Sequence, residues 1–358
     1  MLRSPSSWSQ VSRETILALD RAGCDVSITN CRGFLHDIDF ALDPRIVELL
    51  DKPRHTDIEI AFTYPPNYRK LLGEKKIGML VYESTVVPDH WVRAVNEHLD
   101  RLLVPTTWCR DIMANSGCEP ARIAIVPYGA DPKRFNPSAP PLELPGKGEF
   151  RFLCVGTPHI RKGLLELVQA FCREFRQGEG VRLIIKTTYI PTQRGKRSFW
   201  EIPDLPGYVQ QCRREAGDSA PVDILVEQRR PDEMAGYYTA ASCCVQPSYA
   251  EGFGVAIFEA MACGRPLIAT GWSGHMDYCN ESNCFLLDYD LVPASDAQYD
   301  VKSAGSLVAK PRVEHLRELM RYVFEHQDEA EARGQAAAND VSKMTWDASA
   351  QRMIAMLQ

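Results

Sequence analysis

The chain has 358 residues, 45% of them hydrophobic and 25% charged, with a formal net charge of −6. This length suggests about two domains, and the composition is that of a soluble globular protein. The acidic balance argues against a nucleic-acid partner. No apolar run approaches the ~18 residues that cross a bilayer, and the first ten residues lack the apolar stretch of a secretory signal. We therefore expect a cytoplasmic protein.

Short apolar runs alternate with helical patterns through the first 127 residues. The expected strands are 24–29, 57–62, 77–82, 101–105 and 122–127. The expected helices are 10–22, 66–73, 88–98 and 107–117. Strands that alternate with helices predict a parallel sheet covered on both faces.

A break in composition follows at 127–149, where proline and glycine are frequent and neither a helix nor a strand can continue. The alternation then resumes. The expected strands are 151–156, 182–187, 223–228, 242–247, 266–270 and 284–288. The expected helices are 162–176, 205–216, 231–241, 255–263, 312–326 and about 345–357.

These patterns predict an α/β protein with two Rossmann-like domains, whose parallel sheets face a cleft. The predicted boundaries are 1–130 for an N-terminal domain, 131–150 for the linker, 151–340 for a C-terminal domain and 341–358 for a last helix that packs against either domain. In such sheets ligands bind at the carboxyl ends of the strands.

The run EGFGVAIFEAMACGRP, residues 251–266, is the most informative segment. It follows a predicted buried strand, so a glycine-rich turn leads into a helix whose first backbone N–H groups favour an anion. Glu251 precedes the turn and Glu259 lies in the helix. Two acids around an anion site suit a ligand that carries phosphates between hydroxyl-bearing sugars. Solvated glutamates at an ordinary helix start are the alternative.

A second segment, GTPHIRKG at 156–163, also follows a predicted strand. Arg161 and Lys162 could neutralise a diphosphate. Cations at a helix start otherwise oppose the helix dipole, and a bound anion removes that conflict. Two further candidates for contact with a sugar or an acceptor are Glu83, at the end of a predicted strand, and His275 in WSGHMDY. A surface or capping role is the alternative for each.

The twelve cysteines contain no C-x-x-C pair and lie mostly in apolar surroundings, which favours reduced cysteines packed as small hydrophobic residues. The eight histidines show no metal-ligand spacing. The sequence therefore shows no pattern typical of a metal site.

Together these motifs resemble the retaining glycosyltransferases of the family-4 type, which have the GT-B fold and an E-x7-E motif. The resemblance covers roughly residues 77–290 and includes VPYGADPKRFNP at 126–137 and VPTTWCRDIMANSG at 104–117. It implies a nucleotide-diphosphate sugar as donor, bound mainly by the C-terminal domain, and a sugar, glycolipid or polysaccharide precursor as acceptor on the side of the N-terminal domain. It also implies that no metal and no cofactor is needed, since Arg161 and Lys162 replace the metal. A glycolipid acceptor would imply peripheral contact of the protein with the cytoplasmic face of a membrane.

The resemblance also implies roles for individual residues. Glu259 would hold the ribose hydroxyls, Glu251 would orient the transferred sugar, and Arg161 with Lys162 would stabilise the leaving diphosphate. Backbone groups of the turn and helix start would assist. The implied donor-binding set is completed by Gly252, Phe253, Gly254, Val255, Ala256, Gly156 and Thr157.

This sequence departs from its relatives at several positions. Thr157 stands where many of them carry an arginine, and residues 4–12 contain no glycine where a glycine-rich loop is common. Three alternatives therefore stay open. They are a GT-B epimerase or phosphorylase, a non-catalytic sugar-nucleotide binder, and a nicotinamide oxidoreductase, which the lack of G-x-G-x-x-G disfavours. A pyridoxal-phosphate phosphorylase would need a Schiff-base lysine, for which Lys186 is the strand-borne candidate.

Overall fold

The computed structural model describes residues 2–3, 6–29, 41–54, 57–63, 66–188, 201–297 and 305–357. The chain divides into two compact units. Unit 1 contains Met1–Tyr82, Val86–Asp131 and Lys343–Gln358, and unit 2 contains Glu83–Thr85 and Pro132–Ser342. The C-terminal helix thus groups with unit 1, and the linker predicted at 131–150 falls in unit 2 from Pro132 onward.

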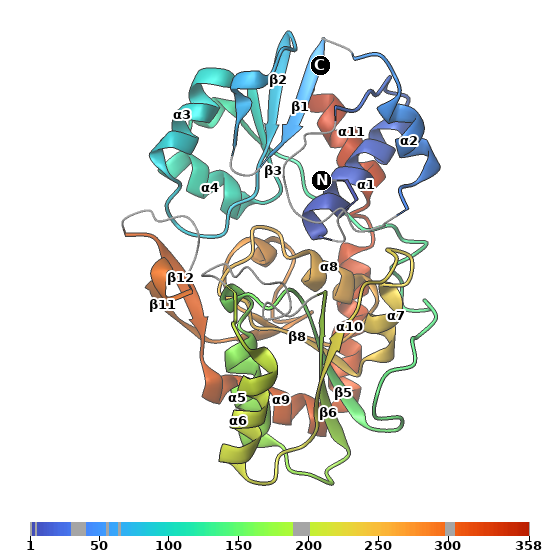
Figure 1. The fold of residues 1–358 in the computed structure, drawn as a ribbon, viewed down its shortest axis with the longest axis vertical. Coiled ribbons are helices and arrows are strands. Elements are labelled where there is room, and N and C mark those ends of the chain that lie inside the picture. Colours follow the sequence, from blue (N-terminus) through green and yellow to red (C-terminus); the bar gives the residue numbers. More distant parts are fainter. Residues whose placement is uncertain are drawn as a thin grey trace. The chain divides into compact units, whose positions relative to one another are not determined.

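Unit 1 has a parallel sheet in the order β1-β2-β3-β4. Its strands are β1 (Ile58–Phe62), β2 (Lys75–Met79), β3 (Arg101–Val104) and β4 (Ile123–Ile125). Its helices are α1 (Ser7–Arg21), α2 (Pro44–Leu50), α3 (Asp89–His98), α4 (Thr107–Asn115) and α11 (Trp346–Leu357), with the short turns η1 (Tyr68–Lys70) and η2 (Pro120–Arg122). Helices α3 and α4 lie on one side of this sheet, and α1, α2 and α11 lie on the other (Figure 1).

Two predictions in unit 1 are wrong. Residues 24–29 form no strand and pair with no strand among the described residues; one backbone hydrogen bond there joins the Ile28 N–H to the Leu49 carbonyl. The helix predicted at 66–73 is only the three-residue turn η1. The Glu59 carboxylate accepts from the N–H groups of Leu72 and Gly73, so these donors are bound to a side chain instead of a helix.

Unit 2 has a parallel sheet of six strands in the order β10-β9-β8-β5-β6-β7. Its strands are β5 (Phe150–Val155), β6 (Val181–Thr187), β7 (Val222–Val226), β8 (Cys243–Gln246), β9 (Leu267–Thr270) and β10 (Phe285–Leu287). Its helices are α5 (Leu164–Glu174), α6 (Leu205–Ala216), α7 (Ala235–Ala240), α8 (Val255–Ala262), α9 (Val313–Glu325) and α10 (Gln327–Val341), with the turns η3 (Ile160–Lys162), η5 (Gly274–Asp277) and η6 (Ala294–Ala297).

The strand order places a topological switch point between β5 and β8. The chain runs outward from β5 through β6 to β7 on one side, and through β8 and β9 to β10 on the other. Loops that leave the two central strands diverge at their carboxyl ends and create a crevice for ligands. Helices α5, α6 and α9 cover one face of the sheet, and α7, α8 and α10 cover the other (Figure 1). Both sheets are parallel, as predicted.

The antiparallel hairpin of β11 (Tyr289–Pro293) and β12 (Leu307–Pro311) was not predicted. It explains why residues 83–85 group with unit 2. The N–H of Leu307 donates to Thr85 Oγ1 at 2.8 Å, and the N–H of Thr85 donates to the Leu307 carbonyl. The hydroxyls of Ser84 and Ser306 are also hydrogen-bonded. Helices α2 and α10 are also elements that the sequence patterns did not predict.

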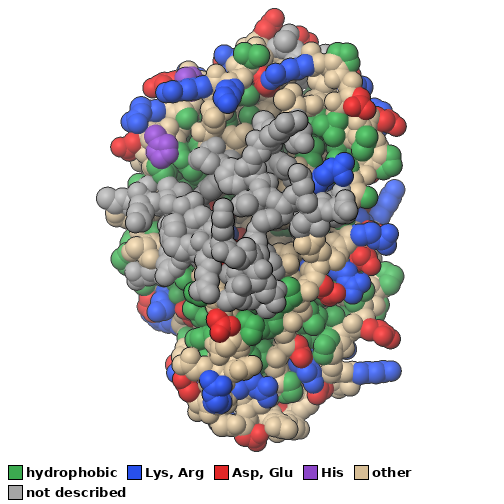
Figure 2. All heavy atoms as spheres, in the orientation of Figure 1, with side chains coloured by type: hydrophobic (Ala, Val, Ile, Leu, Met, Phe, Trp, Pro, Cys, Tyr) green, Lys and Arg blue, Asp and Glu red, His purple; other side chains and the backbone are tan. Residues whose placement is uncertain are grey.

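The eleven described cysteines are all free, and ten of them are buried. None of the helices within the described ranges combines the length and the hydropathy that a membrane span requires. Where Figure 2 colours the surface, acidic and basic side chains are interspersed.

Candidate functional site

The loop after β5 begins at Gly156, whose N–H donates to the Lys186 carbonyl at 3.1 Å. Arg161 and Lys162 follow in the turn η3, just before α5 begins. Gly163 has a φ of 66°, and a Cβ there would lie 1.9 Å from the Pro247 carbonyl oxygen. Only glycine allows this approach, so Gly163 brings the two cations against the loop that follows β8.

The loop after β8 carries Glu251, which is 6% exposed. Its Oε1 accepts from Lys162 Nζ at 2.6 Å and from Ser248 Oγ at 2.7 Å. Its Oε2 lies 3.4 Å from Arg161 Nη1. The Arg161 guanidinium also donates to the Ala250 carbonyl. The structure thus brings together the three residues for which catalytic roles were predicted, at the carboxyl ends of the two central strands.

The charges of this cluster balance. Burial by itself would raise the pKa of Glu251, but Lys162 and Arg161 together with the Ser248 hydrogen bond lower it to about 2. Glu83 Oε1 lies 3.3 Å from Arg161 Nη2, so this predicted residue joins the cluster as well. Two cations and two carboxylates give a formal net charge of 2 − 2 = 0.

Ser273 is a residue of this site that sequence reasoning missed. Its φ of 82° and ψ of −159° belong to a region used almost only by glycine, and it is the one non-glycine residue with positive φ in the described part of the chain. Its Oγ accepts from the Glu251 N–H at 2.9 Å. Beside it, the Gly274 N–H donates to the Glu251 carbonyl at 2.8 Å. The strained loop therefore fixes the backbone of Glu251.

Helix α8 starts directly after Gly254, which has a φ of 84° and provides no side-chain cap. The first N–H groups of the helix, at Val255 and Ala256, have no carbonyl one turn earlier in the helix to bind. The Phe253 ring is 3% exposed and packs against Phe258 and Tyr278. The ring therefore belongs to the core, and the backbone of this turn is the part available to a ligand.

Glu259, one turn into α8, is 5% exposed. Its Oε2 accepts from the Tyr238 hydroxyl of α7 at 2.8 Å. Burial raises the pKa of Tyr238 well above its ordinary value, and the neighbouring carboxylate adds to this effect. Tyr238 is a second residue that the sequence patterns did not mark, since it lies in a buried helix beside another buried tyrosine, Tyr237, and resembles any core residue.

His275 is more deeply buried than its predicted role suggests, whereas Thr157 has intermediate exposure. His275 is fully buried in η5, and its Nε2 lies 2.6 Å from the Thr270 carbonyl oxygen. Burial lowers the pKa of His275, so the ring is neutral. The Thr157 carbonyl accepts from the His159 N–H at 2.7 Å. Contacts of either residue with a ligand stay predictions.

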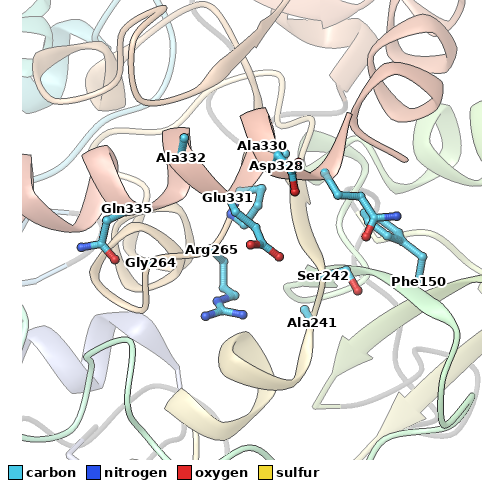
Figure 3. A pocket seen from close by; sticks show the side chains of 12 residues that line it. Phe150, Ala241, Ser242, Gly264, Arg265, Asp328, Ala330, Glu331, Ala332 and Gln335 are labelled. Carbon is cyan, nitrogen blue, oxygen red and sulfur yellow. The ribbon is translucent and has the colours of Figure 1, made fainter. Parts of the chain in front are cut away.

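A cavity of about 640 Å³ lies elsewhere in unit 2, at the amino ends of the strands (Figure 3). Ser242, Arg265 and Glu331 are among the residues that line it. It contains none of the residues of the cluster, and ligands of parallel sheets bind at the opposite edge. No group of acidic, histidine or cysteine side chains in the described ranges is arranged to hold a metal ion.

Residues 149–299 match the family model described as glycosyl transferases group 1. D-inositol 3-phosphate glycosyltransferase of Pseudarthrobacter chlorophenolicus is 29% identical over 214 residues, which are 56% of this chain and 47% of that protein. The corresponding protein of Corynebacterium jeikeium is 25% identical over 72% of this chain and 57% of its own length. The chain thus spans about half the length of the curated relatives it matches.

Several solved structures have a similar fold. A sucrose-phosphate synthase from Thermosynechococcus elongatus has a TM-score of 0.60 at 22% identity, over 81% of this chain and 68% of its own. Anabaena HepE in complex with UDP and glucose has a TM-score of 0.59 at 16% identity, over 79% and 71%. A Rickettsia africae glycosyltransferase has a TM-score of 0.61 at 14% identity, over 99% and 82%. The chain therefore has the GT-B fold with two Rossmann-like domains, and its residues 149–299 match the glycosyl transferases of group 1.

Proposed function

We propose that this protein is a retaining, metal-independent glycosyltransferase of the family-4 type. It moves a hexosyl group from a nucleotide-diphosphate sugar to a sugar, glycolipid or polysaccharide-precursor acceptor. The observation that carries the proposal is the buried Glu251 carboxylate, held by Lys162 and Arg161 at the switch point of the sheet. A cytoplasmic location, with contact to a membrane face when the acceptor is a glycolipid, is part of the proposal.

The donor's diphosphate would bind Arg161, Lys162 and the first N–H groups of α8. Glu251 pairs with both cations, so we infer that its carboxylate lies beside the space that the diphosphate would take. When the donor binds, the cations turn to the phosphates and Glu251 accepts hydrogen bonds from hydroxyls of the transferred sugar. Glu259, already oriented by Tyr238, would accept from the ribose hydroxyls.

The reaction breaks the bond between the anomeric carbon and the diphosphate oxygen, and forms a bond from that carbon to the acceptor oxygen on the same face. The acceptor's proton passes to the departing phosphate oxygen, so no protein nucleophile is needed. Negative charge grows on the diphosphate as it leaves. The two cations and the helix start stabilise that charge at a buried site, which is a role that a metal ion can also have.

Two experiments test this proposal. A thermal-shift screen against UDP, GDP, ADP and CMP sugars identifies the donor, because a ligand at 100 times its Kd adds about 2.7 kcal/mol of stability. Transfer from that donor is then followed by NMR, which also reports the anomeric configuration of the product. We expect retention, and loss of transfer in Glu251→Ala and Lys162→Ala but not in Lys147→Ala, an exposed lysine of unit 2.

Other outcomes favour the alternatives. Tight nucleotide binding with no transfer to any acceptor favours a non-catalytic binder. An absorbance band of pyridoxal phosphate in the purified protein favours a phosphorylase. Full transfer activity in both site variants contradicts the assignment of Glu251 and Lys162.

A further inference from the structure

Lys186 is a cation of unit 2 that the proposed function does not use. It lies near the carboxyl end of β6, and its carbonyl accepts from the N–H of Gly156, the first residue of the loop after β5. The residue is 4% exposed. Its Nζ lies over the ring of Tyr237, 5.6 Å from the ring centroid. Within the described ranges, no hydrogen bond or ion pair joins this ammonium group to another residue.

A lysine so deeply buried normally has an anionic or carbonyl partner, because desolvation of the charged group is costly. Burial lowers the pKa of Lys186, while the negative charges of Glu227 and Glu259 oppose that shift. Glu227 is already engaged, since it accepts from the Tyr237 hydroxyl and pairs with Arg229 Nη2 at 3.0 Å. Within the described ranges, the Lys186 ammonium group therefore has N–H donors that no protein acceptor binds, and it lies at the edge of the sheet where ligands are expected.

The position of Lys186 indicates which part of a donor it faces. The cluster of Arg161, Lys162 and Glu251 belongs to the loops after β5 and β8, and β6 is the next strand outward from β5. Adjacent residues of α7 connect the two regions, because Tyr238 holds Glu259 and Tyr237 lies under Lys186. A nucleotide donor has its groups in the order diphosphate, ribose and base. If the phosphates occupy the crevice and the ribose lies at Glu259, the base therefore extends toward β6 and β7.

We propose that the Lys186 side chain donates a hydrogen bond to a carbonyl oxygen of the donor's base, and that it thereby selects uracil- or guanine-type donors over adenine. This inference rests on the proposed function. On its Watson–Crick edge adenine carries an exocyclic amine where uracil has O4 and guanine has O6, and this amine cannot accept a hydrogen bond from an ammonium group. A hydrogen bond that involves a charged group is worth enough to give a preference of about tenfold or more.

The test is calorimetric titration of UDP, GDP and ADP into the wild-type chain, Lys186→Met and Lys147→Met. Methionine keeps the length and most of the apolar volume of the lysine. We expect the wild type to bind UDP or GDP more tightly than ADP. Lys186→Met should weaken that preferred binding about tenfold or more and change ADP binding less than twofold. Lys147→Met should bind all three as the wild type does.

Three results overturn the inference while the proposed function stands. The wild type could bind ADP most tightly. Lys186→Met could bind UDP and GDP as tightly as the wild type, or its affinity could fall by the same factor for all three nucleotides. A wild type that binds none of them contradicts the proposed function itself. If Lys186→Met does not fold, Lys186→Gln replaces it, because the amide still donates and should retain part of the preference.

Discussion

Breaking the Lys162–Glu251 pair should destabilise the protein by about 2–3 kcal/mol at pH 7. A pKa of about 2 for Glu251, against an ordinary 4.5, corresponds to about 3 kcal/mol in favour of the ionised carboxylate. Of the groups that lower this pKa, Lys162 contributes most. Lys162→Met therefore removes much of the stabilisation of the ionised carboxylate and leaves its charge buried. The cost stays below the full 3–5 kcal/mol of a broken buried pair because Arg161 and Ser248 still contact Glu251.

Urea unfolding followed by circular dichroism measures this effect. Since the folded-state pKa of Glu251 is depressed, its stabilisation is present above pH 4.5 and is lost as the pH falls toward 2. The difference in free energy of unfolding between the wild type and Lys162→Met should therefore become smaller below pH 4.5. The double variant Lys162→Met/Glu251→Gln should be more stable than Lys162→Met alone. A gap that does not change with pH, or a double variant no more stable than the single, would refute the reasoning.

Three further predictions concern residues that shape the site. Tyr238→Phe should cost about 1–3 kcal/mol in the same unfolding assay, because a buried oxygen of Glu259 loses a donor; an unfolding free energy equal to that of the wild type would contradict this role. Gly163→Ala should destabilise far more than Gly148→Ala, since both have positive φ but only the first places a Cβ against Pro247; equal losses would contradict this account. Ser273→Gly should be more stable than Ser273→Ala by about 1–3 kcal/mol, because both lose the Oγ acceptor but glycine relieves the strained backbone; the reverse order would be inconsistent with strain.

The alternation of apolar runs and helical patterns was enough to predict the parallel sheets, because a parallel strand is covered on both faces and is apolar along its length. This pattern did not predict the elements whose formation depends on tertiary contacts. Residues 24–29 have the composition of a strand but pair with no strand among the described residues. The hairpin of β11 and β12 is exposed at several positions and lacks a continuous apolar run. Helix α10 is rich in alanine and charged residues, so its apolar periodicity is weak.

For the candidate site, sequence reasoning predicted residues that the structure brings together, but not the contacts that support them. The glycine turns and the paired acids and cations marked Glu251, Arg161 and Lys162, which the structure brings together. Ser273 and Tyr238 carry no such mark. A serine with positive φ has no characteristic sequence pattern, and a tyrosine within a buried helix looks like any core residue.

The most direct measurement of the central claim is a comparison of Glu251→Gln with the wild type in two assays, calorimetric titration of the preferred nucleoside diphosphate and transfer from the corresponding sugar donor. The substitution raises the formal charge of the cluster from 0 to +1, since one of two carboxylates is neutralised beside two cations. We predict that the diphosphate binds at least as tightly as in the wild type, while transfer falls about a hundredfold or more, as when a group that stabilises the transition state is removed. Transfer at the wild-type rate, or loss of diphosphate binding in a variant that remains folded, would contradict the account.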